Sequence, residues 1–183
     1  FWIPSNKTTA PRVETSPPPA AEREDMNYRC IARLDELAAY LEGAKIIAFD
    51  FETAPLDAYR GEEWAALDAH KARITGISLS VSEGTAVYVP LAHRVGKNAE
   101  AHEDILQYLK DAVFENVRVI KVAHNLAFEA MFLYAQGIVV QAPCYDTIAA
   151  AQLTLKNREE FRKLADSGLK LLAILESQLR RCN

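Results

Sequence analysis

The chain has 183 residues, half of them hydrophobic, and a formal net charge of −4 at pH 7. This length allows one ordinary domain with a real core, and this composition excludes a disordered protein. The acidic balance argues against a protein that coats duplex DNA through a broad basic face. It does not exclude a nucleic-acid enzyme, because metal ions bound at an acidic site change the local sign of the charge.

The cysteines indicate the cellular compartment of the protein, and the two ends of the chain indicate whether it is part of a longer polypeptide. Cys30, Cys144 and Cys182 are odd in number and lack metal-ligand spacing, which is typical of reduced thiols in a cytoplasmic protein. No run of about 18 or more apolar residues predicts a membrane span, and the N-terminus lacks a signal-peptide pattern. The chain begins at Phe1 and ends at Asn183, and we interpret both ends as cuts in a longer polypeptide.

Residues 1–27 are rich in Pro, Ser, Thr and charged side chains, with Pro17-Pro18-Pro19 at their centre. We interpret them as an extended tail or linker, with a proline-rich ligand for another domain as the alternative. Residues 28–183 then form one domain, which we expect to be incomplete at its C-terminal end.

Hydrophobic periodicity predicts the elements of this domain in chain order. A helix that starts near Ile31 ends before Gly43, and a short apolar strand covers residues 45–51. The remaining expected elements are a hairpin of strands 72–82 and 85–90, a helix 101–115, a strand 117–124, a helix 125–136, a short strand 138–140, and helices 146–155 and 167–179. This order predicts an α/β fold: a mixed sheet of antiparallel and parallel strands with helices on both faces.

Two carboxylates follow the apolar run of residues 45–49. Because side chains alternate along a strand, Asp50 and Glu52 point to one face while Phe49 and Phe51 point to the other. Burying an unpaired carboxylate costs roughly several kcal/mol, and two neighbouring carboxylates also repel each other. A divalent cation would offset both costs. The alternative is a pair of solvated loop acids, or acids that cap the segment after Thr53.

A second polar group follows the strand at 117–124. Asn125 and Glu129 are four residues apart on a predicted helix and therefore share a face, so Glu129 can extend toward the strand end that carries Asp50. The alternatives are that Asn125 caps the helix, that Glu129 is a surface acid favoured by the helix dipole, and that His124 is an ordinary strand-end histidine.

Together these motifs resemble the DEDD superfamily of 3′–5′ exonucleases, and in particular the proofreading domain of family A DNA polymerases in the form carried by phages and prophages. The stretch "DFETAPLD" matches the first motif from Asp50 to Asp57, and "HNLAFE" matches the second from His124 to Glu129. The stretches "YDTIAAAQL" and "SGLKLLA" resemble two further segments of the family. The similarity covers about residues 28–175 and implies a ribonuclease H-like fold.

The resemblance implies two divalent ions, Mg²⁺ or Mn²⁺, held by Asp50, Glu52 and Glu129 as the catalytic and metal-binding residues. The residues expected to hold the 3′ end of single-stranded DNA are Thr53, Leu56, His124 and Asn125. The implied reaction releases nucleoside 5′-monophosphates, and the implied partner is a polymerase domain that follows this segment in the parent chain.

Two departures from the family pattern qualify these expectations. The second motif usually ends in Asp, where this chain has Glu129. The third motif, Y-x-x-x-D or H-x-x-x-x-D, is absent from the sequence, so we expect weak or no activity from these 183 residues alone. Two other hypotheses stay open: a non-catalytic module that binds DNA or a protein, and an RNA-trimming relative with the same site.

Overall fold

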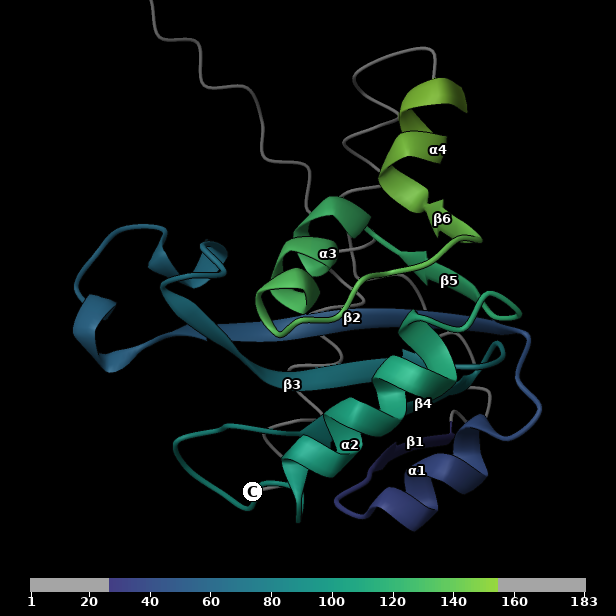
Figure 1. Ribbon diagram of the computed structural model, residues 1–183, viewed down its shortest axis with the longest axis horizontal. Coiled ribbons are helices and arrows are strands. Elements are labelled where there is room, and N and C mark those ends of the chain that lie inside the picture. Colours follow the sequence, from purple (N-terminus) through teal and green to yellow (C-terminus); the bar gives the residue numbers. More distant parts are fainter. Residues whose placement is uncertain (1–26, 155–183) are drawn as a thin grey trace, which may run out of the picture.

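The computed structural model describes residues 27–154 (Figure 1). Its strands are β1 (Asn27–Cys30), β2 (Ile46–Pro55), β3 (Ala72–Ser80), β4 (Thr85–Pro90), β5 (Ile120–Ala123) and β6 (Cys144–Asp146). Its α-helices are α1 (Leu34–Leu41), α2 (His102–Leu109), α3 (Leu126–Ala135) and α4 (Thr147–Thr154). Short helical turns are η1 (Asp57–Tyr59) and η2 (Ala65–Leu67), and the π-helical η3 (Lys110–Phe114) continues α2.

The six strands form one mixed sheet in the order β1-β4-β3-β2-β5-β6. Strand β3 is antiparallel to β2 and β4, whereas the pairs β1–β4, β2–β5 and β5–β6 are parallel. The β3–β4 hairpin confirms the prediction for residues 72–90, and the antiparallel and parallel pairs confirm the predicted mixed sheet of an α/β fold. Strand β2 lies near the centre of the sheet, as its apolar sequence indicates.

Helices α1, α2 and α3 connect parallel strands and pass in the same direction along the sheet. Because such crossovers are right-handed, all three lie on one face, and Figure 1 shows α2 and α3 in front of the sheet. This face holds the hydrophobic core. Phe49, Phe51 and Phe114 pack there edge to face or tilted, with ring centroids 5.1 to 6.1 Å apart.

The opposite face of the sheet is polar near β2. Asp50, Ser78 and Tyr88 lie side by side across β2, β3 and β4, and Gly76 is the cross-strand neighbour of Glu52. A Cβ atom at position 76 would lie 1.8 Å from the Tyr88 hydroxyl oxygen. Only glycine therefore lets the Tyr88 ring pass over this point of the sheet.

Strand β1 corrects two predictions made for the start of the domain. Asn27, assigned to the tail, pairs with Thr85 at the start of the sheet. Ile31, assigned to the first helix, donates its N–H to the carbonyl of Tyr88 at 2.8 Å and is extended, so the helix begins only at Leu34. The strand was missed because its residues are mostly exposed and carry no apolar alternation.

The short strand predicted at residues 138–140 is wrong. Gly137 has a φ of +74°, and the N–H of Ile138 donates to the carbonyl of Leu133 at 2.9 Å, which closes the end of α3. Ile138 is buried as the apolar residue that commonly accompanies such a helix end. The strand that pairs with β5 is β6, where Cys144 lies opposite Lys121.

The other predictions agree with the structure in part. The strand expected at 117–124 is shorter, from Ile120 to Ala123, whereas the helix expected at 101–115 is present as α2 and η3. The helix expected at 167–179 and most of the tail lie outside the described residues. Within residues 27–154, no helix has the length and apolar character needed to cross a membrane.

Candidate active site

The site lies where β2 and β5 part. Strand β5 pairs with β2 only along residues Ile46 to Ala48, whereas β2 continues to Pro55. Asp50 therefore lies just beyond the last residue of β2 that β5 covers. The chain turns there through His124 and Asn125 into α3, and this places the first turn of α3 against the open edge of β2. Ligands of open α/β sheets bind at such points, outside the carboxyl ends of the strands.

Glu129 is the most unusual residue of this region. It lies in the first turn of α3 and is only 2% exposed. Its Oε2 atom is buried without a hydrogen-bond partner among the described residues. Burial, with smaller contributions from the nearby charges of Asp50 and Asp146, raises the pKa of Glu129 to about 8. A buried carboxylate with an unused oxygen is a site that a cation would stabilise.

Asp50 lies near enough to Glu129 for its charge to act on that carboxyl group. Burial raises the pKa of Asp50, and the charge of His124 opposes this rise. The charge of His124 acts on Asp50 and that of Asp50 acts on Glu129, so residues of the two sequence motifs lie near one another. Because Mg²⁺ and Mn²⁺ prefer carboxylate oxygens and need only one or two of them beside phosphate oxygens, the Asp50–Glu129 pair fits a divalent cation.

Glu52 lies two residues further along β2, on the face that carries Asp50. A β-bulge follows it, since the register with β3 shifts between Glu52 and Thr53. The hydroxyl of Thr75 donates to the carbonyl of Glu52 at 3.0 Å and fixes this bulge. In the described part of the chain, no three His, Cys, Asp or Glu side chains converge closely enough to hold a metal ion. A shared metal site of Glu52 with Asp50 and Glu129 therefore stays a prediction.

The predicted substrate-binding residues lie around the carboxylate pair. His124 is exposed, and its Nδ1 lies 2.7 Å from the hydroxyl of Thr147. The side chain of Asn125 is exposed, and its backbone adopts a left-handed conformation with φ of +75°. Leu56 is half-buried at the end of β2. Thr53 donates its hydroxyl to the carbonyl of Ala66 at 2.7 Å, so this group stabilises a loop in addition to any contact with substrate.

Asp146 has a larger structural role than the cap of its own helix that the sequence suggests. Its carboxylate accepts hydrogen bonds from the backbone N–H groups of Asn125, Leu126 and Ile148, at 2.9 to 3.1 Å. Partial burial opposes ionisation, but these hydrogen bonds lower the pKa of Asp146. Asp146 thus caps α3, which has no cap from the side chain of Asn125, and positions the first turn that carries Glu129.

Replacing Asp146 by Ala should lower the free energy of unfolding by about 2 kcal/mol, because two helix starts lose an ionised acceptor. Urea unfolding monitored by circular dichroism at neutral pH measures this loss. Because the pKa of Asp146 is lowered in the fold, the stabilisation is present above the unfolded pKa and is lost as the pH falls through the folded pKa. Asp146→Asn keeps one acceptor oxygen and should lose less; equal stability of all three forms would contradict the assignment.

The loop after β4 makes a contact that the sequence pattern does not predict. The Nε2 atom of His93 lies 2.6 Å from the Tyr88 hydroxyl, and burial lowers the pKa of His93. The Tyr88 ring passes over Gly76, the cross-strand neighbour of Glu52, so Tyr88 lies on the sheet face that carries Asp50 and Glu52. The only signal in the sequence was a tyrosine on the polar face of β4, followed five residues later by a histidine.

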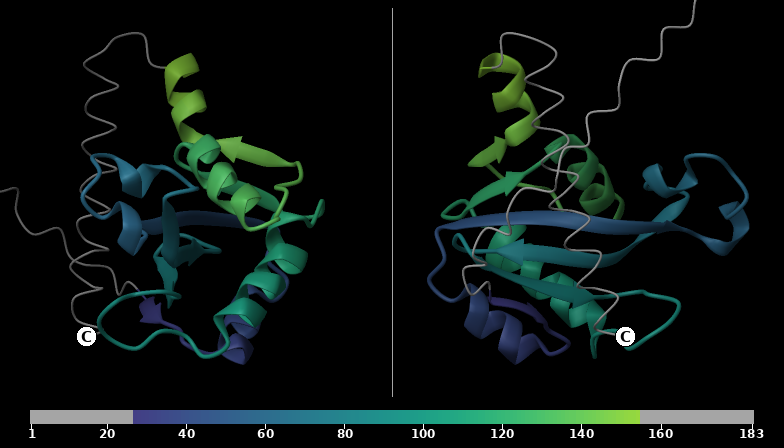
Figure 2. Two further views of the ribbon diagram at one scale, coloured as in Figure 1. Left: turned by 60° about the vertical axis from the view of Figure 1, so that its left-hand side comes forward. Right: turned by 180° about the vertical axis from the view of Figure 1, so that it is seen from behind.

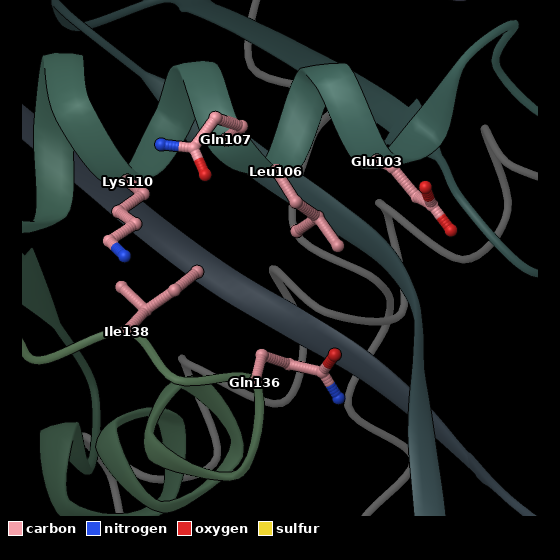
Figure 3. Close-up of a pocket in the computed structure, with 6 residues that line it drawn as sticks. All are labelled: Glu103, Leu106, Gln107, Lys110, Gln136 and Ile138. Atoms are coloured by element: carbon pink, nitrogen blue, oxygen red, sulfur yellow. The ribbon is translucent and has the colours of Figure 1, made fainter.

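A pocket elsewhere on the protein does not contain any of the predicted site residues. It lies between α2 and the turn after α3 and is lined by Glu103, Leu106, Gln107, Lys110, Gln136 and Ile138 (Figure 3). Residues 136 and 138 follow the C-terminal end of α3, whereas Glu129 lies in its first turn. The pocket is therefore separate from the carboxylate pair.

The mixed sheet, with β3 as its antiparallel strand and acids at the end of its central strand, has the ribonuclease H-like architecture. A family model described as 3′-5′ exonuclease matches residues 27–181. The chain belongs to this 3′-5′ exonuclease family. Among solved structures, the EXO domain of Nibbler from Aedes aegypti is similar with a TM-score of 0.53 and 14% sequence identity, over 74% of this chain and 60% of that chain. That likeness supports the fold.

Two curated relatives are named DNA polymerase I. The protein from Pseudomonas aeruginosa is 30% identical over 120 residues, which are 64% of this chain and 12% of the relative. The protein from Borreliella burgdorferi is 30% identical over 135 residues, which are 72% of this chain and 13% of the relative. The chain thus spans about an eighth of the length of these relatives.

Proposed function

We propose that the chain removes nucleotides from the 3′ end of single-stranded DNA by metal-dependent hydrolysis, with Asp50, Glu52 and Glu129 as the residues that hold two divalent ions. The observation that carries this proposal is the buried carboxylate of Glu129 near Asp50, with one oxygen that has no hydrogen-bond partner within residues 27–154. The family of the chain supports the reaction class. Mg²⁺ or Mn²⁺ bound there would supply an activated water and stabilise charge on the leaving oxygen.

The side chains around the pair are suited to the terminal nucleotide. Asn125 and His124 are exposed next to the carboxylates, so their polar atoms can reach the sugar and phosphate. Leu56 lies at the end of β2, where an apolar side chain can contact the last base without reading its sequence. The product of this reaction is a nucleoside 5′-monophosphate.

The partner in this proposal is a polymerase domain that follows the exonuclease segment in the parent polypeptide. The support comes from the relatives named DNA polymerase I, of which this segment matches about an eighth. In such an arrangement the exonuclease removes misincorporated nucleotides during DNA replication.

A second candidate function is a non-catalytic module that keeps the fold and binds DNA or a protein. It is favoured by Glu129, which stands where the second motif usually has Asp. A longer side chain at this position moves its oxygens by one methylene group. The two candidates differ in one property: the catalytic domain must bind divalent cations at the carboxylates, and the non-catalytic module need not.

Manganese soaking tests the proposal directly. In crystals of the chain soaked with MnCl₂ and thymidine 5′-monophosphate, we expect anomalous density between Asp50 and Glu129, with the nucleotide phosphate bound to the same ion. Crystals of Asp50→Asn should lose this density and keep the fold. Nucleotide bound without manganese would support the non-catalytic module, and manganese bound only at other acids would overturn the exonuclease site.

A further inference from the structure

The connection between β2 and β3 projects beyond the end of the sheet. It comprises residues 56–71, which we call the arm, and appears as the blue loop at the left of Figure 1 and on the right of the rear view in Figure 2. The arm presents two large apolar side chains to solvent: Trp64 is 71% exposed and Leu67 is 50% exposed. An indole side chain this exposed contributes little burial free energy to folding and is accessible to a ligand.

The backbone holds the Trp64 side chain outward. Trp64 has φ of 65° and ψ of 5°, a left-handed conformation that is unfavourable for a bulky residue. The next residue, Ala65, is buried, and the N–H of Leu67 donates to the carbonyl of Trp64 at 2.8 Å. Such conformations persist only where the surroundings enforce them, and they cluster at functional sites.

Two hydrogen bonds tie the arm to the carboxylate end of β2. The hydroxyl of Thr53 donates to the carbonyl of Ala66 at 2.7 Å, and the N–H of Leu56 donates to the carbonyl of Lys71 at 2.8 Å. Thr53 directly follows Glu52. Because Trp64 is two residues from Ala66, its Cα lies within about 8 Å of that anchor. The indole is therefore within reach of a strand whose end is bound at the carboxylates.

The charges of the arm are largely paired with one another. Arg60 forms an ion pair with Asp57, and Lys71 forms one with Glu62 at 2.5 Å. The arm also carries Glu63 and Asp68 among its acids. This surface does not attract phosphates, so a nucleic acid that contacts it must do so through its bases. Stacking on an aromatic side chain is the contact that a single strand makes without charge and without sequence preference.

We propose that Trp64 is a stacking site for a base of the single strand whose 3′ end is bound at Asp50 and Glu129. This inference rests on the proposed exonuclease function and adds a binding position for the strand outside the carboxylate site. The arm then aligns the DNA strand for cutting, and Trp64 selects strands that have an exposed, unstacked base. A base-paired strand has its bases covered by neighbours and gains nothing from Trp64.

Tryptophan fluorescence tests this proposal at the residue itself. The chain contains Trp2 and Trp64, so a Trp2→Phe variant reports on Trp64. Ca²⁺ in place of Mg²⁺ or Mn²⁺ keeps the carboxylates intact and suppresses cutting during the titration. We expect the emission of Trp64 to fall saturably on addition of oligothymidine and to be insensitive to the same strand in a duplex. The quenching should persist as the salt concentration rises, because stacking does not release counterions.

Affinity measurements provide the matched comparison. Trp64→Ala should bind 5′-fluorescein oligothymidine between about fivefold and about 100-fold more weakly, whereas Trp64→Phe should stay near the parent. Tyr134→Ala removes an aromatic side chain that is 74% exposed on α3 and should have no effect. If the strand is bound and shortened but Trp64→Ala binds as tightly as the parent, the stacking site is wrong and the exonuclease proposal stands. If no form binds the strand, both fail.

Discussion

Replacing Asp50 by Asn should lower the rate at which the chain shortens a 5′-labelled single strand by at least about 100-fold. Asp50 combines a half-buried position with a charge that acts on Glu129. Loss of a residue that only orients a metal ligand typically costs about 10- to 100-fold in affinity or activity, so loss of a ligand should cost at least as much. The dissociation constant for Mn²⁺, measured by titration calorimetry, should rise by a similar factor.

The assay must detect slow cutting, because we expect a low rate from these 183 residues alone. Excess protein over labelled strand and Mn²⁺ in place of Mg²⁺ serve this purpose. Asp35→Asn is the matched control, since Asp35 is an aspartate exposed on α1 and paired with Arg33, and such surface pairs contribute little to stability. Equal rates and equal Mn²⁺ affinities for Asp50→Asn and the parent chain would refute the metal site.

Replacing Glu129 by Gln should make the protein more stable at alkaline pH when no metal is present. Burial raises the pKa of Glu129 from 4.5 to about 8, so in the folded state the group stays protonated over a range in which it is ionised in the unfolded state. Unfolding therefore releases a proton, and stability falls as the pH rises from about 4.5 to about 8. The full pKa shift of Glu129 corresponds to a loss of about 5 kcal/mol in the free energy of unfolding. A Gln side chain does not ionise, so Glu129→Gln avoids this loss.

Urea unfolding in EDTA, at about pH 5 and about pH 8.5, measures this difference. From about pH 5 to about pH 8.5, the free energy of unfolding of the parent chain should fall by a few kcal/mol more than that of Glu129→Gln. Glu103→Gln is the matched control, because Glu103 lies in the first turn of α2 and is exposed. Parallel pH profiles for the parent and Glu129→Gln would contradict the burial of this carboxylate. Added Mn²⁺ should stabilise the parent more at the higher pH, since a metal binds the ionised form.

Local sequence signals predicted the elements whose pattern is strong. The apolar lead-in to Asp50 predicted a central strand, the turn at Glu83-Gly84 predicted the hairpin, and Gly137 predicted the end of α3. Each of these elements is predicted from a single short segment of the sequence. The signals are the alternation of apolar residues, a glycine or an apolar stripe, and each of them spans only a few residues. The meeting of Asp50 with Glu129 also followed from the sequence, because each acid stands at a predictable end of its element.

Other features depend on strand pairing or burial that local sequence patterns do not reveal. Strand β1 has no apolar pattern and forms because Asn27 can pair with Thr85. The apolar residues 138–140 are typical of a strand, yet the N–H of Ile138 donates to the carbonyl of Leu133 and closes the end of α3. A lysine is usually exposed to solvent, but Lys121 is fully buried. Its Nζ donates to the carbonyl of Asn116 at 2.8 Å. Long-range pairing and burial decided these three cases, and neither is visible in a short window of sequence.

The sequence by itself therefore determined the class of fold, the family and the two motifs that carry the acids, since these depend on residue type and spacing. Only the tertiary structure showed that Glu129 is buried, with one oxygen unpartnered among the described residues, that Asp146 caps the helix that carries it, and that Trp64 is exposed in a left-handed backbone conformation. The physical reason is that desolvation and hydrogen bonding depend on every neighbour in space. Composition and periodicity describe only neighbours along the chain.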